Sequence, residues 1–179
     1  MEISLEELAK KAGFTSWAYV TPQELEVRQE VREMCRLGQC GCFGRCWACP
    51  PHCPTLEECA EAIRSRKKGF LVCSVAQLED PFDYFGMKHA EAQHKRAFQD
   101  LAGTLVSQVD RLLPLGAGPC TICEKCTCPD QDCRHPEKAI SSMEGYGLIV
   151  SDVCQLAGIA YYAGAQTVSF FSCYLFDDK

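Results

Sequence analysis

GFLVCSVA, residues 69–76, is an uninterrupted apolar run that lies between the basic stretch 64–68 and a loop at 81–87. Its short length and its Val, Leu and Phe content predict a buried β-strand. Residues 88–113 follow with apolar side chains along one stripe at helical spacing. Residues 114–118 then predict a short strand. Strand, helix and strand in this order predict a right-handed crossover, and therefore an α/β domain.

Capping boxes predict the starts of two more helices, because Ser4 with Glu7 and Thr55 with Glu58 have the Ser/Thr-x-x-Glu spacing. Further strands are expected at 17–20 and 167–176, and further helices at 29–37, at 136–146 and from Ser151 onward. The predicted fold is α/β, with a small, mostly parallel or mixed sheet of about three to five strands, packed helices and two cysteine-rich metal-binding loops. One metal-binding domain is expected over 1–179, with its cysteine-rich loops at 35–59 and 120–135.

The overall composition argues against several classes of protein. Hydrophobic residues make up 47% and charged residues 23%, which is typical of a folded domain and not of a disordered chain. No apolar run approaches the roughly 18 residues that a membrane-spanning helix needs, so no membrane partner is expected. The net charge of −6, without a long basic block, disfavours nucleic-acid binding.

Cysteine is the unusual residue, with 15 among 179. Such a density indicates either a disulfide framework or metal ligation. Residues 1–8 are acidic and amphipathic and lack the features of a secretory signal, so a cytoplasmic location is expected. Thiols stay reduced there, and free thiols at short spacing bind metal.

The downstream segment, 120–135, has the sharper pattern, Cys120-x2-Cys123-x2-Cys126, followed by Cys128 and Cys133. Three thiolates at steps of three, closed by a distal fourth, are typical of a [4Fe–4S] cluster in ferredoxins. Zinc ribbons usually need two separated Cys-x2-Cys knuckles, and only one compact run is present. Cys128 comes too early for the fourth ligand of the ferredoxin run, whereas Cys133 has enough chain to reach.

The upstream segment, 35–59, has more thiols than one four-ligand site needs. Its cysteines are Cys35, Cys40, Cys42, Cys46, Cys49, Cys53 and Cys59. Cys59 falls in the first turn of the helix that Thr55 caps, where the helix dipole is expected to lower its pKa. Outside both segments, Cys73, Cys154 and Cys173 lie in apolar runs and are expected to be structural. His89 and His94, on the long helix, are expected to face solvent.

Two long motifs resemble the signatures of a known family. The first runs from Arg32 to Cys59 through Phe43-Gly44-Arg45 and Trp47-x-Cys49-Pro50-Pro51, and the second from Gly116 to Gly147. The chain resembles a family of small prokaryotic cysteine-rich proteins known only as predicted metal-binding proteins of unknown function. The resemblance implies ligands at Cys35, Cys40, Cys49 and Cys59 from the first motif, and at Cys120, Cys123, Cys126 and Cys133 from the second. It also implies that Cys42, Cys46, Cys53 and Cys128 are additional cysteines of this sequence.

Three functions fit these patterns. The first is an iron–sulfur protein with one or two [4Fe–4S] clusters that transfers electrons to a redox partner protein. The second is a zinc-binding structural or interaction module. The third is an enzyme whose substrate binds at an incompletely ligated cluster. Iron and sulfide content separates the first and third functions from the second.

Overall fold

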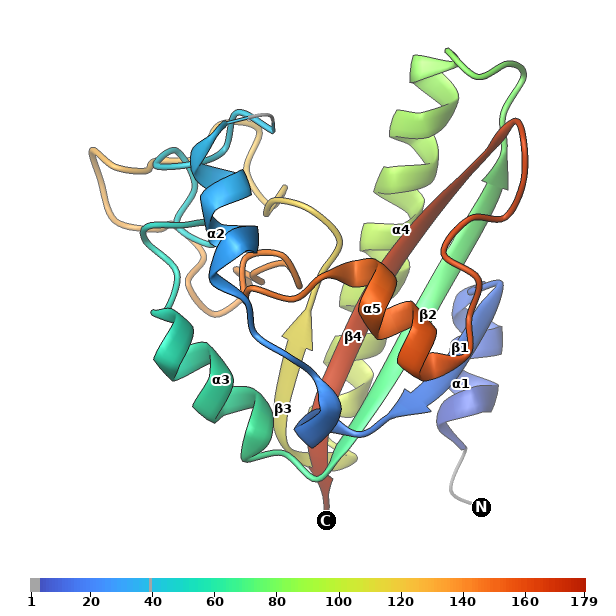
Figure 1. Ribbon diagram of the computed structural model, residues 1–179, viewed down its shortest axis with the longest axis horizontal. Coiled ribbons are helices and arrows are strands. Elements are labelled where there is room, and N and C mark those ends of the chain that lie inside the picture. The colour runs from blue at the N-terminus through green and yellow to red at the C-terminus, as the bar shows by residue number, and fades with distance from the viewer. Residues whose placement is uncertain (1–3, 39) are drawn as a thin grey trace.

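The computed structural model describes residues 4–38 and 40–179. Within them four strands form one sheet in the order β1-β2-β4-β3, and every pair of neighbours is antiparallel (Figure 1). The strands are β1 (Ser16–Val20), β2 (Lys68–Gln77), β3 (Val109–Leu115) and β4 (Thr167–Asp178). The α/β class and the buried strand at 69–76 are confirmed.

The pairing of the strands differs from the expected mostly parallel or mixed sheet. β2 and β3 run in the same direction, as a crossover requires, but they do not pair with each other. β4 lies between them and pairs antiparallel with both, so that Cys173 is opposite Leu71 on one side and Leu115 on the other. The local pattern of 69–118 contains no sign of this inserted strand, because its partner residues lie about 60 to 100 positions away.

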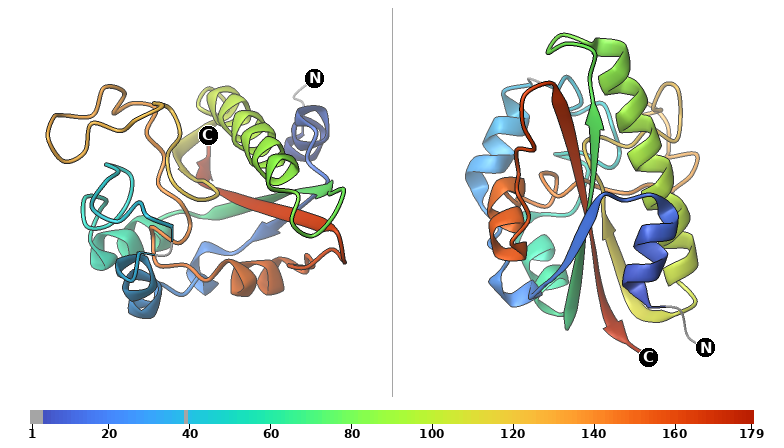
Figure 2. Two further views of the ribbon diagram at one scale, coloured as in Figure 1. Left: turned by 90° about the horizontal axis from the view of Figure 1, so that it is seen from above. Right: turned by 90° about the vertical axis from the view of Figure 1, so that its right-hand side faces the viewer.

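The two faces of the sheet bury separate apolar clusters, because successive strand residues point to opposite sides. On one face, Phe70 and Tyr174 pack with α1 (Leu5–Ala12) and α4 (Tyr84–Leu105). On the other, Leu71 and Cys173 pack with α3 (Leu56–Arg64) and α5 (Val150–Ala157). The sheet is therefore the middle of three layers, which the edge-on view in Figure 2 shows.

Both predicted capping boxes are present. The Ser4 and Thr55 side chains accept hydrogen bonds from the backbone N–H groups of Glu7 and Glu58, and both glutamates bond back to the cap residues. A further helix, α2 (Gln29–Arg36), ends beside the upstream segment, and the short 3-10 helix η1 (Pro22–Glu24) precedes it. No helix in the described part of the chain is long and apolar enough to cross a bilayer.

Several expectations about single elements and residues were wrong. The long helix spans Tyr84–Leu105 instead of 88–113, and the strand expected at 114–118 is β3, Val109–Leu115, which pairs with β4. Residues 136–146 form turns instead of a helix, and the Met143 N–H bonds to the Gly116 carbonyl at 3.1 Å. His94 is buried, with only 1% of its surface exposed, whereas it was expected to face solvent. Cys73, Cys154 and Cys173 are buried in the sheet core, as expected.

The two cysteine segments lie next to each other on the side of the sheet where β3 is the edge strand (Figures 1 and 2). The upstream segment connects α2 to α3, and the downstream segment follows β3. Each segment is therefore attached to the sheet by elements whose positions the apolar clusters fix.

Candidate metal centre

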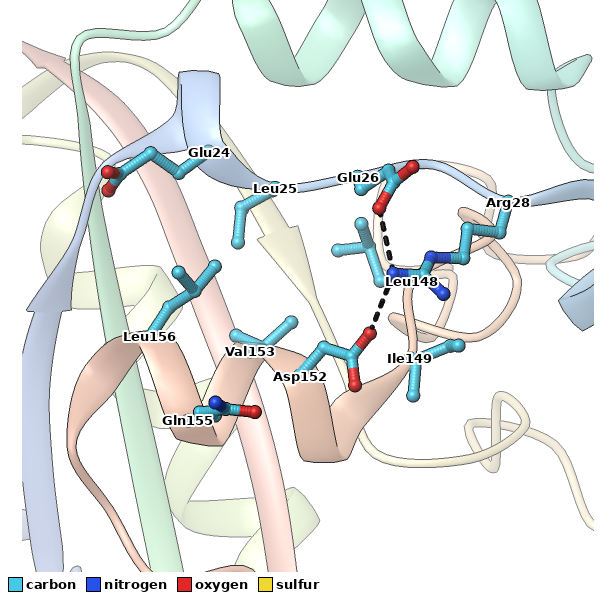
Figure 3. A pocket seen from close by; sticks show the side chains of 10 residues that line it. All are labelled: Glu24, Leu25, Glu26, Arg28, Leu148, Ile149, Asp152, Val153, Gln155 and Leu156. Carbon is cyan, nitrogen blue, oxygen red and sulfur yellow. Dashed lines mark hydrogen bonds and ion pairs between the residues drawn. The ribbon is translucent and has the colours of Figure 1, made fainter.

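The upstream segment begins on α2 and ends on α3. Cys35 lies in the last turn of α2, and Cys59 lies on the buried side of α3. α2 is fixed at its start by Arg28, whose N–H bonds to the Gly147 carbonyl at 2.8 Å. The Arg28 guanidinium also bridges Glu26 at 2.7 Å and Asp152 at 3.1 Å, as Figure 3 shows. These contacts hold the cysteine-bearing helix against α5.

The pocket drawn in Figure 3, of about 270 Å³, lies between the chain that leads to α2 and the helix α5. Its described lining consists of apolar side chains with Arg28, Gln155 and three carboxylates, and includes none of the cysteines. This pocket is therefore not a site for thiol ligands.

Backbone turns order the loop between the two helices. The Gly44 N–H bonds to the Pro50 carbonyl at 2.9 Å, and Gly44 has a φ of +68°, which favours glycine. The Cys49 N–H bonds to the Cys46 carbonyl at 3.0 Å, and the Cys53 N–H bonds to the Cys49 carbonyl at 3.1 Å. The thiols of the loop are thus presented by successive tight turns.

The downstream segment is tied to α4 and to the upstream loop. The Lys95 ammonium donates to the Pro119 carbonyl at 2.8 Å and pairs with Glu91 at 2.8 Å. The Trp47 indole N–H donates to the Gln131 carbonyl at 3.0 Å. Cys128, which is buried, has its Sγ 3.6 Å from the Gly44 carbonyl oxygen. The two segments therefore pack directly against each other.

All four predicted ligands of the downstream motif line one cavity of about 20 Å³. The cysteines around it are Cys120, Cys123, Cys126 and Cys133, with Cys46 from the upstream segment as a fifth. Trp47 and His135 also line it. A space of this size holds about one water-sized sphere. A single ion fits within this volume, whereas a cubane cluster requires the cysteine side chains to turn outward.

Cys46 and Cys49 form a buried pair against which Cys42, Cys120 and Cys126 pack. A hydrogen bond from the Cys49 thiol to the Cys46 sulfur lowers the pKa of Cys46 and raises that of Cys49. Cys46 is therefore the thiol of this pair that ionises first. Metal ligands are thiolates, so the lowered pKa is consistent with a ligand role for Cys46 at this cavity.

A second group of thiols gathers around the Arg32 side chain. The Arg32 Nη2 donates to the Pro54 carbonyl at 2.6 Å and lies 3.5 Å from the Cys59 Sγ. The Cys53 Sγ is 3.6 Å from the Gly145 carbonyl oxygen. Burial is the main cause that raises the pKa of Cys59 to about 11, which contradicts the lowering expected from the helix dipole.

The described structure does not gather the four predicted upstream ligands into one group. Cys35 and Cys59 lie near Arg32 and Cys53, whereas Cys49 packs with Cys46 beside the downstream cysteines. Cys40 is exposed in the turn that follows α2. Among residues 4–38 and 40–179, no three Cys, His, Asp or Glu side chains already converge as they would around a bound ion. Metal binding therefore requires these side chains to reorient.

The comparison with family models agrees with the cysteine pattern. Residues 18–176 match the model of a family described as "predicted metal-binding protein (DUF2284)". The chain belongs to this family. The resemblance of the two sequence motifs to a predicted metal-binding family is thereby confirmed. A search of curated proteins found no match, and neither did a search of solved structures.

Two half-buried charged residues lie near the upstream thiols, and cysteine spacing alone does not place either of them there. The Arg32 Nε and the Glu144 Oε2 are buried, and neither has a hydrogen-bond partner in the part of the chain that the structure describes. Arg32 lies three residues before Cys35, and Glu144 lies within the second motif. Their positions inside the two motifs were the available signal. Cys46 and Cys53 were missed as site residues because spacing alone does not show which thiols meet in space.

Proposed function

We propose that this chain is an iron–sulfur protein that binds one or two [4Fe–4S] clusters and transfers single electrons to a redox partner protein. The observation that carries the proposal is the cavity whose walls contain all four cysteines of the Cys120-x2-Cys123-x2-Cys126 … Cys133 pattern. Thiolates at this spacing are ligands of cubane clusters. The thiolates bind the cluster, and the cluster supplies one-electron redox chemistry.

The surroundings of the cavity support electron transfer. Cys123, Cys126 and Cys133 are half-buried, so a cluster held by them lies close to the surface. Trp47 and Ile122 cover part of the cavity with apolar surface. Limited solvent access and a short distance to the surface both favour exchange of electrons with a docked partner.

Zinc is the second candidate, and one observation favours it. A cavity of about 20 Å³ lined by thiols has room for a single ion and not for a cluster. Four thiolates around one ion form a tetrahedral structural zinc site. In that case the metal would hold the two segments together and the protein would act as a structural or interaction module.

Anaerobic purification followed by reconstitution and analysis of iron, acid-labile sulfide and zinc tests the proposal. We expect about eight iron and eight sulfide per chain for two clusters, with broad absorbance near 400 nm that dithionite bleaches. About four of each would indicate one cluster. Zinc bound near stoichiometrically, without labile sulfide, would overturn the iron–sulfur proposal in favour of the zinc module.

A matched pair of variants controls for unfolding. Cys123→Ser removes a thiol that lines the cavity, whereas Cys154→Ala removes a fully buried thiol from the sheet core. We expect Cys123→Ser to lose the downstream metal and keep its circular dichroism. Cys154→Ala should keep its metal even if it lowers the unfolding temperature.

A further inference from the structure

We propose that Cys53, rather than Cys49, completes a second metal centre with Cys35, Cys40 and Cys59, and that Arg32 balances the charge of these thiolates. The inference rests on the proposed metal-binding function. It concerns which cysteines share a centre and which charged side chain serves it. Neither the spacing of the cysteines nor the family description assigns these.

The position of Arg32 brings Cys53 and Cys59 to one place. The Arg32 Nη2 donates to the carbonyl of Pro54, the residue directly after Cys53, and the same nitrogen lies 3.5 Å from the Cys59 Sγ. The Cys59 Sγ is also 3.5 Å from that carbonyl oxygen. One guanidinium nitrogen therefore contacts both the backbone next to Cys53 and the sulfur of Cys59.

Cys35 joins this group through α2. It lies three residues after Arg32, and residues three apart share a face of a helix. Cys40 and Cys53 are the thiols close enough to Cys35 to act on it electrostatically, together with the carboxylate of Glu144. Thiols from the end of α2, the end of the loop and α3 thus lie near Arg32, and Cys40 joins them through its proximity to Cys35.

Charge provides a second argument that does not depend on the sulfur positions. The guanidinium of arginine stays charged in proteins, and Arg32 is half-buried, so an opposite charge nearby stabilises it. The Arg32 Nε is buried without a partner among the described residues, and Arg32 forms no ion pair there. Neutral thiols leave this charge uncompensated. Metal-bound thiolates compensate it, since four cysteinates around Zn²⁺ or a [4Fe–4S]²⁺ cluster carry a net negative charge.

Cys49 belongs to the other group of thiols. It packs with Cys46 and Ala48, against Cys120 and Cys126 of the downstream segment. The turn closed by the Cys53 N–H and the Cys49 carbonyl, at 3.1 Å, separates the two cysteines. The neighbouring thiols that act most on Cys49 are Cys46, Cys42 and Cys40, and neither Cys35 nor Cys59 is among them, so Cys40 lies between the two groups.

The decisive experiment uses Cys123→Ser as a background, because this change removes a ligand of the downstream centre only. Cys53→Ser and Cys49→Ser are each added to it, and metal per chain is measured after anaerobic reconstitution. We expect the background protein to keep about half of the wild-type metal. We expect Cys53→Ser to remove that remainder and Cys49→Ser to leave it in place.

The opposite result, in which Cys49→Ser removes the remaining metal and Cys53→Ser keeps it, would overturn the assignment. A background protein without any metal would show that no second centre exists, while the proposed function still stands on the downstream site. Wild-type protein that takes up neither iron nor zinc would instead overturn the proposed function itself.

Two further measurements guard against misfolding of the variants. The Cys123→Ser protein is alkylated with and without metal. Metal should protect Cys53, Cys35 and Cys59 from alkylation. The extent of Cys49 alkylation should be the same with and without metal. Arg32→Gln should lower the reduction potential of the remaining centre if it is a cluster, because loss of a nearby cation disfavours the more negative reduced form. Equal protection of Cys49 and Cys53 by the metal, or an unchanged potential in Arg32→Gln, would contradict the proposal.

Discussion

The Trp47 indole donates a hydrogen bond of 3.0 Å to the carbonyl oxygen of Gln131, across 84 positions of the sequence. This contact joins the upstream cysteine segment to the downstream one. The Trp47 ring also meets the His52 ring edge-on, with centroids 4.8 Å apart. Trp47 is thus held by both segments and lines the cavity of the downstream cysteines.

Trp47→Phe should loosen the downstream segment, because it removes the indole N–H and keeps an aromatic ring. A hydrogen bond of this kind contributes about 1 kcal/mol. We expect limited proteolysis within 120–135 to become several-fold faster while the unfolding temperature changes little. Trp17→Phe, in strand β1, is the matched control and should leave that rate unchanged. Equal cleavage rates for wild type and Trp47→Phe would show that the contact does not order the segment.

Removal of metal should affect the two segments and spare the sheet. The clusters on both faces of the sheet are apolar and need no metal, whereas segments 35–59 and 120–135 consist mainly of turns. We expect apoprotein to keep its far-UV circular dichroism and to become sensitive to protease in both segments. In a Trp17→Phe background, Trp47 fluorescence should be quenched with metal and recover on chelation. Oxygen should mimic chelation only for an iron–sulfur cluster. Equal protease resistance with and without metal would mean that packing alone orders the segments.

Cys128→Ser should keep most of the downstream metal, whereas Cys126→Ser and Cys133→Ser should lose it. Cys126 and Cys133 line the cavity, and Cys128 does not; its Sγ is 3.6 Å from the Gly44 carbonyl oxygen at the junction of the two segments. Iron and sulfide analysis of the three variants measures this. The assignment is reversed if Cys128→Ser bleaches the protein and Cys133→Ser does not.

His94 should make stability depend on pH. Its ring lies between Ser74 and Ser172, with both ring nitrogens 2.8 Å from a serine oxygen, and burial lowers its pKa from 6.5 to about 4. The unfolded chain binds a proton at higher pH than the folded chain does. The contribution of His94 is therefore complete above about pH 6.5 and is lost as the pH falls toward 4, by up to about 3 kcal/mol.

The measurement for His94 is urea unfolding from pH 7 to pH 4, for wild type and His94→Gln. The variant should be less stable at neutral pH, and it should lack the part of the pH slope that His94 contributes. The difference in unfolding free energy between the two proteins should therefore shrink as the pH falls. A difference that stays constant between pH 7 and 4 would exclude this titration.

Gly147→Ala should destabilise the junction of the elements that carry Cys35 and Cys59. Gly147 has a φ of +79°, and an added Cβ would lie 2.8 Å from the Leu56 Cδ2 and 3.2 Å from the Arg28 carbonyl oxygen. Strain and overpacking together should cost about 2–4 kcal/mol. Gly158→Ala is the control, because its φ is +67° and its Cβ would meet nothing within 4 Å. Similar losses of unfolding free energy in both variants would leave only backbone strain as the cause.

Local sequence patterns correctly predicted the elements whose structure depends on residues close together in the chain. The capping boxes at Ser4 and Thr55 and the strand at 69–76 were confirmed because each depends on neighbouring residues. The predicted end of the long helix was wrong because Val109 and Leu112 continue its apolar stripe, and only the pairing of Val109 and its neighbours with β4 makes 109–115 a strand. The position of β4 itself depends on partners far away in the chain.

The candidate metal site also has a part that the sequence predicted and a part that it did not. The spacing Cys120-x2-Cys123-x2-Cys126 located a set of thiols that the structure places around one cavity together with Cys133. Spacing could not show that Cys46 reaches the same cavity, because that contact connects two segments over 70 residues apart. It also could not identify Arg32 as the centre of the other thiol group, since the relevant contacts are made by its side chain with Pro54 and Cys59.

The place of β4 between β2 and β3 has a consequence for how the protein is made. A ribosome delivers both cysteine segments before it delivers residues 167–178, and until then β2 and β3 have no strand between them to pair with. β1 and β2 can pair before β4 is made, although α2, the upstream segment and α3 lie between them in the chain, but the sheet cannot close around its middle. The thiols are therefore exposed on an unfinished scaffold during translation, so insertion of metal is expected to follow release of residues 167–178.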